Sequence, residues 1–521
     1  MGLLDKIQKK TEKSIIKESK PTLSKGLLLK RSVIKDENVL DSYVVNVDDI
    51  SVEVVIKKEE GYLYYLIPEI EKIENSLSKL SKDNINLIKM QIGELGLIEY
   101  KQIKEYLSDF SVRYNLSIPY IDSLAKYFYL ISGRLGLLEI PLNDDQLEEV
   151  MVNGYNVPVF VFHRKHQMCE TNIILDRNEV DRIIESIANL VNRPIDSRVP
   201  MLDAFLPDGS RVNATTADIT MNGATLTIRK FSKNPLTVID LINFGTLDLD
   251  VAAFLWQVVE GYFGAKPANT LIVGGTGSGK TTLLNVLSLF SMYNERIITI
   301  EDTPELQIPH KHVIKMVTRP ARPGMPEYEV TMDDLIKNAL RMRPDRIFVG
   351  EVRGEEAHSL LVAMNTGHDG CSGTLHANSA DEAILRLTSP PMNVPKIMLT
   401  ALDFIINQQR IKRGGKTIRR ILEILEIVKG RMGEGSSLAK TTLYEYNGLK
   451  DSLERKGICM WEEEVCEIAG ISREELLRDR ENRKKVLNYL YKNNIKKLED
   501  VSKYITAYQS DPEKLLRTLS I

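Results

Sequence analysis

Residues 274–281 read Gly274-Gly275-Thr276-Gly277-Ser278-Gly279-Lys280-Thr281, which fills every fixed position of the G-x-x-x-x-G-K-[ST] phosphate loop. The apolar run at 270–273 predicts a buried strand before the loop, and the apolar spacing at 282–287 predicts a helix after it. Glycines let the backbone N–H groups converge on phosphate oxygens, and the helix N-terminus adds positive charge. The segment therefore predicts a nucleoside triphosphate site, the alternative being a glycine-rich turn before an ordinary helix.

Two side chains of the loop have predicted roles. The Lys280 ammonium would pair with the β- and γ-phosphates, and the Thr281 hydroxyl would ligate Mg²⁺. ATP and Mg²⁺ are therefore the expected ligands. The residues predicted to hold them are Gly274, Gly275, Thr276, Gly277, Ser278, Gly279, Lys280, Thr281 and Thr282.

The composition is that of an ordinary globular protein with several domains. The chain has 521 residues, 43% hydrophobic and 27% charged, which is too long for one compact core. A net charge of −3 gives no reason to expect specific nucleic-acid binding. The four cysteines form no C-x-x-C pair, which argues against a zinc site or a disulfide framework. No uncharged apolar run reaches the roughly 18 residues that a membrane-spanning helix needs.

Shifts in charge and periodicity divide the chain into six regions. The first is a basic arm with ten Lys or Arg against three acidic residues, either a solvated tail or a segment attracted to an anionic membrane or acidic partner. Strand and helix patterns then alternate, and Asn178 is expected to cap a helix of the third region. The regions are a basic arm at 1–35, an accessory α/β region for partner docking at 36–135, an N-terminal α/β domain at 136–233, a linker at 234–248, a phosphate-loop domain at 249–430 and a charged helical region at 431–521.

Two predicted strands downstream of the loop end in acidic residues. The apolar run at 297–300 leads into Glu301, and the run at 346–350 leads into Glu351. Because the carboxyl ends of parallel strands meet at one sheet edge, both carboxylates should lie near the γ-phosphate. Glu351 is the candidate for holding Mg²⁺ together with Thr281, and Glu301 for activating the attacking water. Either glutamate could instead be a surface salt-bridge partner.

A Gly/Ser/Thr-rich segment at 365–379 carries two histidines eight residues apart. His376 ends a short predicted strand, where its ring could donate a hydrogen bond to the γ-phosphate. By composition alone a structural histidine is the more common case. Zinc is disfavoured because no cysteine or histidine partner stands at ligand spacing.

In this order the motifs resemble those of the type II/IV secretion ATPase superfamily, the motors of type II secretion, type IV pili, archaella and type IV secretion. An aspartate box at 299–305, a Walker B segment at 340–353 and a histidine box at 367–379 follow the phosphate loop. The resemblance covers roughly residues 135–430. The sequence of the histidine box is most similar to that of the archaeal archaellum and pilus branch, and also to those of the type IV secretion and tight-adherence branches. The chain also lacks the four-cysteine zinc element of bacterial type II secretion members.

The resemblance implies an α/β fold, with a RecA-like P-loop motor domain, an N-terminal mixed α/β domain of the PAS-like kind and a helical C-terminal extension. It implies a homohexameric ATPase, peripheral at the cytoplasmic face of the membrane, with a polytopic platform protein as partner. Members bring arginines of the N-terminal domain to the nucleotide, and Arg211 and Arg229 stand at the matching positions. Each could equally be a surface strand residue. His376 would then sense the γ-phosphate.

Three other functions remain open at this point. A nucleic-acid translocase would also use a RecA-like ring, although the balanced charge argues against a basic channel. A traffic ATPase of type IV secretion would carry the same motifs. A nucleotide-binding scaffold without turnover is disfavoured by the intact Lys280, Glu301 and Glu351.

Overall fold

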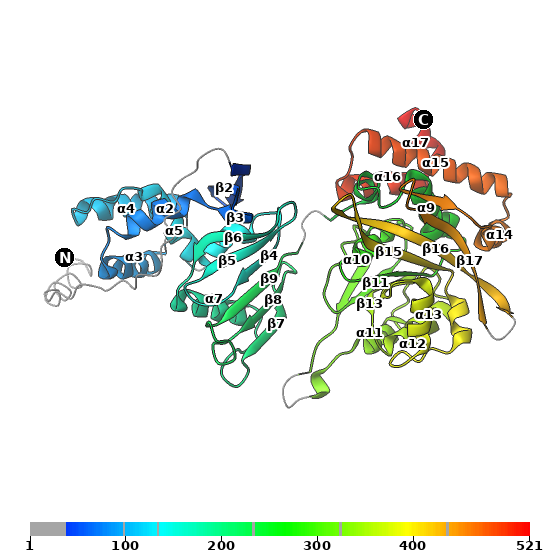
Figure 1. Ribbon diagram of the computed structural model, residues 1–521, viewed down its shortest axis with the longest axis horizontal. Coiled ribbons are helices and arrows are strands. Elements are labelled where there is room, and N and C mark those ends of the chain that lie inside the picture. Colours follow the sequence, from blue (N-terminus) through cyan, green and yellow to red (C-terminus); the bar gives the residue numbers. More distant parts are fainter. Residues whose placement is uncertain (1–37, 97–98, 133–134, 232–234, 322–325, 434–436) are drawn as a thin grey trace. The chain divides into compact units, whose positions relative to one another are not determined.

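The computed structural model describes residues 38–96, 99–132, 135–231, 235–321, 326–433 and 437–521. The predicted basic arm at 1–35 lies outside these residues. The chain divides into two compact units, Met1–Phe231 and Ser232–Ile521, and each is described by itself (Figure 1). No helix in the described part of the chain combines the length and the apolar character needed to cross a membrane.

The first unit is built on one sheet with the strand order β1-β2-β3-β6-β5-β4-β9-β8-β7. All neighbouring strands are antiparallel except β3 and β6, which pair in parallel. Alternating burial along β5, β8 and β9 puts one side of each strand in the core. The strands are β1 Val39–Val47, β2 Ile50–Glu59, β3 Tyr62–Leu66, β4 Leu147–Val152, β5 Pro158–His163, β6 Gln167–Ile174, β7 Met201–Phe205, β8 Arg211–Thr215 and β9 Thr225–Arg229.

Helices of the first unit pack their apolar stripes into the same core as the sheet. They are α2 Pro68–Leu77, α3 Lys82–Glu94, α4 Tyr100–Arg113, α5 Ile121–Ile131, the 3₁₀ turn η2 Gly136–Leu138, α6 Glu139–Leu142 and α7 Arg177–Leu190. The expected cap of α7 at Asn178 is wrong. The Asp176 side chain accepts the Glu179 N–H, and the Glu179 side chain accepts the Asp176 N–H. This capping box starts the helix at Arg177, before Asn178.

The second unit is built on a mixed sheet with the order β12-β11-β13-β14-β10-β15-β16-β17-β18. The strands from β12 to β15 are parallel, and β16, β17 and β18 continue the sheet as antiparallel strands. They are β10 Thr270–Gly274, β11 Ile297–Glu301, β12 Val313–Val317, β13 Arg346–Val352, β14 Ser372–His376, β15 Phe404–Arg413, β16 Lys416–Gly433, β17 Ser437–Asn447 and β18 Ser452–Arg455.

Helices cover both faces of this sheet, with a separate hydrophobic core on each side. One core takes in α9, α10 and the C-terminal helices, and the other takes in α11, α12 and α13 (Figure 1). The helices are α8 Val238–Asn243, α9 Leu249–Gly264, α10 Lys280–Ser288, η3 Pro326–Tyr328, α11 Met332–Ala339, α12 Glu356–Asn365, α13 Ala380–Thr388, η4 Lys396–Ala401, α14 Met460–Ala469, α15 Arg473–Lys492, α16 Leu498–Ser510 and α17 Pro512–Leu519.

The predicted fold class is confirmed. The second unit is a RecA-like motor domain, because one strand, β14, separates the phosphate-loop strand β10 from β13, and parallel strands precede the antiparallel ones. A mixed α/β unit precedes it, and α14–α17 form the helical C-terminal extension. The expected helical character of 431–521 is wrong for 437–455, which forms β17 and β18. Thr441, Thr442 and Tyr444 in this segment favour strand through their branched or aromatic side chains.

Candidate functional site

The phosphate loop and the predicted acidic residues meet at one edge of the second sheet. β10, β11, β13 and β14 are parallel neighbours, so their carboxyl ends lie at the same edge. Gly274, at the start of the loop, pairs in register with His376. Glu301 ends β11, and Glu351 lies next to the end of β13. The structure thus brings together four features that the sequence places far apart.

The loop has the backbone that its glycines permit. Gly277 and Gly279 have φ values of +68° and +93°, a left-handed region that residues with a Cβ avoid. The second glycine is the N-cap of α10, so the first N–H groups of this helix face the end of the loop. Lys280 is 9% exposed, and its ammonium donates to the Gly275 carbonyl over 3.2 Å. Burial lowers the pKa of Lys280, and the nearby Glu351 carboxylate opposes that shift.

Glu301 is a buried carboxylate, and its two oxygens differ in their hydrogen bonds. Its Oε1 accepts the backbone N–H groups of Glu305 and Leu306, at 2.8 and 3.0 Å. Its Oε2 is buried and has no hydrogen-bond partner among the described residues. Burial raises the pKa of Glu301 to about 7, and the two backbone N–H groups oppose that shift. A carboxylate of this kind can exchange a proton near neutral pH.

The neighbouring strand makes room for Glu301. A Cβ built on Gly350 would lie only 3.0 Å from Glu301 Cγ, so a side chain there would displace the carboxylate. The Gly350 carbonyl in turn accepts the Thr374 hydroxyl of β14 over 2.6 Å. Gly350 therefore fixes the close packing of β13 against the end of β11.

Glu351 is half-buried and carries a charged partner. Arg353 Nη2 donates to Glu351 Oε2 over 2.7 Å, and Arg353 Nη1 also lies 3.8 Å from Asp302 Oδ2. The Glu351 side chain is 27% exposed, so the carboxylate can still reach a ligand. Hard oxygen donors such as this carboxylate and the Thr281 hydroxyl suit Mg²⁺. The donor set therefore fits the ion that the loop predicts.

His376 touches the phosphate loop directly. Its Nε2 lies 2.8 Å from the Thr276 hydroxyl, across the register pair of β10 and β14. The ring is only half-buried. A histidine at this position can report a change in the loop to the segment that follows β14.

Sequence reasoning missed three side chains of β15 and β16 that hold the loop. Gln408 Nε2 donates to the Ser278 carbonyl over 2.7 Å, and Arg419 Nε donates to the Gly277 carbonyl over 3.0 Å. Gln409 Oε1 accepts the Gly275 N–H over 3.2 Å. A polar Gln-Gln pair following the apolar run of a central strand was the available signal, because buried amides need partners.

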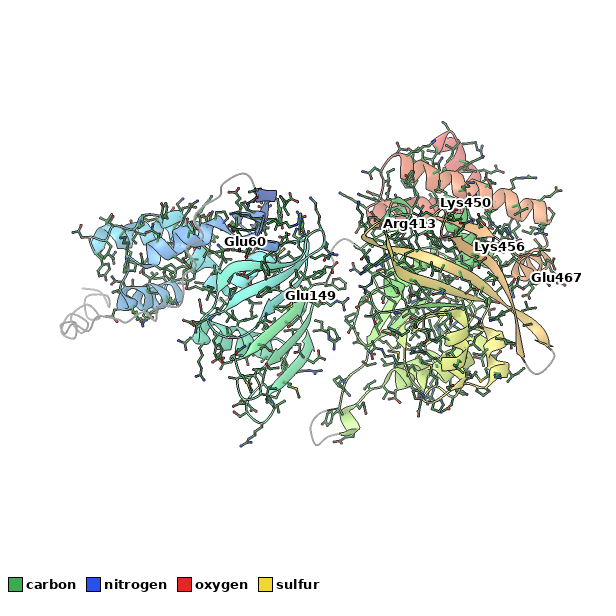
Figure 2. The ribbon with its side chains drawn as sticks, viewed as in Figure 1. Glu60, Glu149, Arg413, Lys450, Lys456 and Glu467 are labelled. Atoms are coloured by element: carbon green, nitrogen blue, oxygen red, sulfur yellow. The ribbon has the colours of Figure 1, made fainter. Side chains whose placement is uncertain are left out.

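The two predicted arginines belong to the first unit and lie opposite each other. Arg211 of β8 and Arg229 of β9 are a cross-strand pair, and both are exposed. Arg211 binds Asp203 with two bonds of 3.1 and 2.8 Å, and Glu149, labelled in Figure 2, pairs in register with Arg229. Two like charges directly opposite each other destabilise a sheet unless an anion compensates them.

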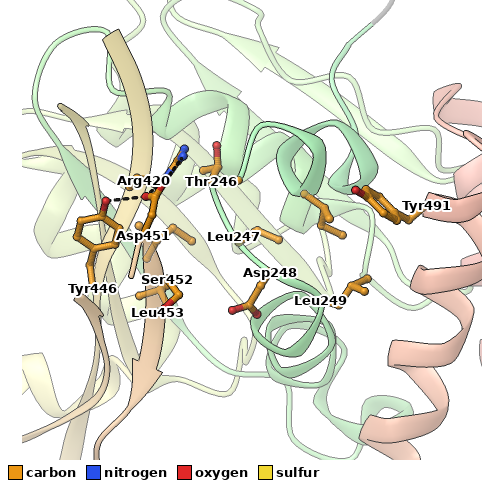
Figure 3. Close-up of a pocket in the computed structure, with 13 residues that line it drawn as sticks. Thr246, Leu247, Asp248, Leu249, Arg420, Tyr446, Asp451, Ser452, Leu453 and Tyr491 are labelled. Atoms are coloured by element: carbon orange, nitrogen blue, oxygen red, sulfur yellow. Dashed lines mark hydrogen bonds and ion pairs between the residues drawn. The ribbon is translucent and has the colours of Figure 1, made fainter. Parts of the chain in front are cut away.

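A separate pocket of about 280 Å³ lies between the α8–α9 connection, β16, β18 and α15 (Figure 3). Arg420 on its wall binds Asp451 with bonds of 2.9 and 3.1 Å, and the Tyr446 hydroxyl also donates to Asp451. Arg420 follows Arg419 on the strand, and consecutive side chains point to opposite faces. None of the residues predicted from the sequence lines this pocket.

Comparisons with known proteins agree with the motifs. A family model described as Type II/IV secretion system protein matches residues 133–505. An uncharacterized protein of Methanocaldococcus jannaschii is 63% identical, over 100% of this chain and 97% of that protein. The Type IV secretion system protein VirB11 of Bartonella henselae is 31% identical, over 54% of this chain and 90% of that protein. The crystal structure of the VirB11 ATPase from the Brucella suis type IV secretion system in complex with sulphate is 27% identical, over 54% of this chain and 90% of that chain, with a TM-score of 0.29.

Proposed function

The chain belongs to the Type II/IV secretion system protein family, and on that premise we propose that it is an ATP-hydrolysing motor. It works as a homohexamer at the cytoplasmic face of the cell membrane and powers assembly of an archaellum or type IV pilus-like filament, or type II secretion. One observation carries the hydrolysis step. A buried carboxylate with an unpartnered oxygen, Glu301, lies at the sheet edge that also carries a complete phosphate loop.

The loop residues bind and orient the nucleotide. Backbone N–H groups at the start of α10 and the Lys280 ammonium bind the phosphates, since helix N-termini and lysine favour anions there. The Thr281 hydroxyl and the Glu351 carboxylate would hold Mg²⁺, which neutralises charge on the phosphates when bound. The burial of Lys280 supports this role, because a desolvated ammonium attracts phosphate more strongly than a solvated one.

Glu301 acts as the base. Its free Oε2 takes a proton from water as the water oxygen bonds to the γ-phosphorus, and the bond from phosphorus to the bridging oxygen breaks. The electron pair of that bond leaves with ADP. A pKa of about 7 suits the step, because the carboxylate is both available and able to accept a proton near neutral pH.

Hydrolysis would be coupled to movement of the first unit. Arg211 and Arg229 are the candidates for reaching the nucleotide from that unit, since their planar forks match phosphate oxygens. Their exposure supports this role, because both side chains are accessible to a ligand, although Arg211 also binds Asp203. Loss of the γ-phosphate, sensed by His376, would then shift the population between two arrangements of the units.

The membrane partner would be a polytopic platform protein that takes up this motion. The 63% identity to the uncharacterized Methanocaldococcus jannaschii protein supports the archaeal branch of the family. A type IV secretion traffic ATPase is the second candidate, supported by the relation to VirB11. A nucleic-acid translocase is the third, and the net charge of −3 disfavours a basic channel. Deletion of the gene separates the first two, since loss of swimming filaments or pili supports the filament branch.

The direct test of the proposed activity is steady-state ATPase kinetics of the full chain and of Glu351→Gln. The variant should bind ATP but lose most turnover, because the amide is a poorer Mg²⁺ ligand. Lys412→Gln, at an exposed position of β15, is the control and should match the parent. Unchanged hydrolysis by Glu351→Gln refutes the assignment. Strong stimulation of the ATPase by DNA would favour the translocase, and size measured in solution with ATP tests the hexamer.

A further inference from the structure

The phosphate loop presents two kinds of backbone group, and a phosphate can satisfy only one kind. Phosphate oxygens accept bonds from N–H groups, so the loop carbonyls need donors from elsewhere in the protein. Gln408 and Arg419 supply donors to the carbonyls of Ser278 and Gly277. Both side chains therefore brace the loop in the shape that turns its N–H groups toward a ligand.

Gln409 differs from this bracing pair because its amide contacts two separate segments. Its Oε1 accepts the Gly275 N–H of the loop over 3.2 Å. Its Nε2 donates to the Asn378 carbonyl over 3.0 Å and to Asn407 Oδ1 over 2.9 Å. Asn378 stands two residues after His376, so a single side chain joins the loop to the segment that follows β14.

A second bond closes the connection. The Thr276 hydroxyl and His376 Nε2 are 2.8 Å apart, so residues 275–276 of the loop and 376–378 of the histidine box meet through two neighbouring links. These two side-chain links extend the backbone pairing of β10 with β14, which puts Gly274 opposite His376, beyond the ends of the strands. The Asn378 carbonyl also accepts Asn407 Nδ2 over 3.3 Å, which fixes the far end of the Gln409 link to β15.

We propose that Gln409 is a positioning residue through which the phosphate loop and His376 respond to the γ-phosphate as one unit. The proposal rests on the proposed function for the identity of the ligand. In this role Gln409 acts through the loop and through the segment after His376. It keeps His376 at a fixed place relative to the loop, so that ATP and ADP are bound with different affinity.

The chain offers a matched pair of variants for the test. Gln409→Met and Gln408→Met remove an amide from adjacent positions and keep nearly the same volume, but only the first cuts the link to the histidine box. Dissociation constants of ADP and of a non-hydrolysable ATP analogue are measured on the full chain. Lys412→Met, exposed on the same strand, is the control.

Gln409→Met should lower the preference for the ATP analogue over ADP by about fivefold, the effect of about one hydrogen bond, with ADP affinity near that of the parent. Gln408→Met should weaken both nucleotides to a similar degree and keep the preference. The proposal is overturned if Gln409→Met keeps the parental preference, or if Gln408→Met loses it equally.

Two further measurements keep the test decisive. Circular dichroism checks that each variant folds, and if Gln409→Met does not fold, Gln409→Asn replaces it with a side chain too short to span both segments. The same two outcomes then decide. A parent chain that binds nucleotide without hydrolysing it would refute the proposed function, and the binding preference of the variants would still test Gln409.

Discussion

Two buried glutamates of the second unit, Glu301 and Glu260, differ in what surrounds them. Burial raises the pKa of both carboxyl groups. Glu260 forms an ion pair with Arg483, whose guanidinium also binds Asp479 over 2.7 Å and is fully buried. Each glutamate has a buried carboxylate oxygen without a hydrogen bond, but among the described residues Glu301 has no ion-pair partner either, so no cation lies beside its charge. The comparison teaches that a shifted pKa marks a reactive group only where the charge is left uncompensated.

The surroundings of Glu260 explain its structural role. Arg483 of α15 lies over the rings of Trp256, Phe263 and Tyr508, at 5.0, 5.3 and 5.1 Å from their centroids. These contacts connect the C-terminal helices to the end of α9, just before the strand that leads into the phosphate loop. An ion pair inside an aromatic cage stabilises a fixed contact and offers no room for a substrate.

The largest expected effect comes from breaking the paired site. Arg483→Met leaves the Glu260 and Asp479 carboxylates buried without a cation, and should lower the free energy of unfolding by about 3–5 kcal/mol. The double variant with Glu260→Gln should lose less than Arg483→Met alone, because one uncompensated charge is gone. Chemical denaturation measures both. A loss under 1 kcal/mol for Arg483→Met would contradict the structural role.

The second effect comes from the unpaired site. Glu301→Gln removes the base and should lower kcat about hundredfold or more, the usual contribution of a positioned base. The variant should unfold at the same or a higher temperature, because a buried carboxylate without a cation becomes a neutral amide. Single-turnover kinetics and thermal unfolding measure the two quantities. A normal kcat would move the role of base to another residue.

The third effect is a pH dependence of kcat that belongs to Glu301, whereas both glutamates make stability depend on pH, because burial raises the pKa of Glu260 to about 7 as well. The folded pKa of Glu301, about 7, lies above its unfolded value, so the folded state holds a proton that the unfolded state has lost. Stability therefore falls as pH rises toward 7, while kcat rises because the ionised base is the active form. Below pH 7, kcat should fall about tenfold per pH unit. Glu260→Gln should keep the fall of kcat below pH 7, and Glu301→Gln should lose it. Measuring kcat as a function of pH for both variants tests this.

The sequence predicted most of the site, because most residues of the site belong to short local motifs. The phosphate loop has a fixed sequence pattern. An acidic residue directly after an apolar strand is expected at the carboxyl edge of a parallel sheet. The fold class followed from the same alternation of strands and helices. The catalytic roles of Glu301, Glu351, His376, Arg211 and Arg229 stay predictions.

The rest depended on pairing between strands that are distant in the sequence. Gln409 contacts the loop only because β15 pairs with β10, so that Val273 lies opposite Asn407. The antiparallel return of β16 brings Arg419 opposite Arg410, beside the loop. The strands at 437–455 were missed although Thr441, Thr442 and Tyr444 favour strand locally, because the charged residues of the flanking C-terminal region outweighed that signal.

The smallest expected effect tests the packing that separates the two glutamates. Gly350→Ala would put a methyl group 3.0 Å from Glu301 Cγ, whereas no glycine touches Glu260 at such a distance among the described residues. The carboxylate must give way by a few tenths of an ångström, so we expect kcat to fall severalfold and stability to fall by about 1 kcal/mol. Gly367→Ala is the control for loss of a glycine elsewhere in the site. Its added Cβ meets nothing within 4 Å, but the φ of +91° adds local strain. If Gly350→Ala keeps full kcat while Gly367→Ala does not, backbone freedom rather than the position of Glu301 limits the rate.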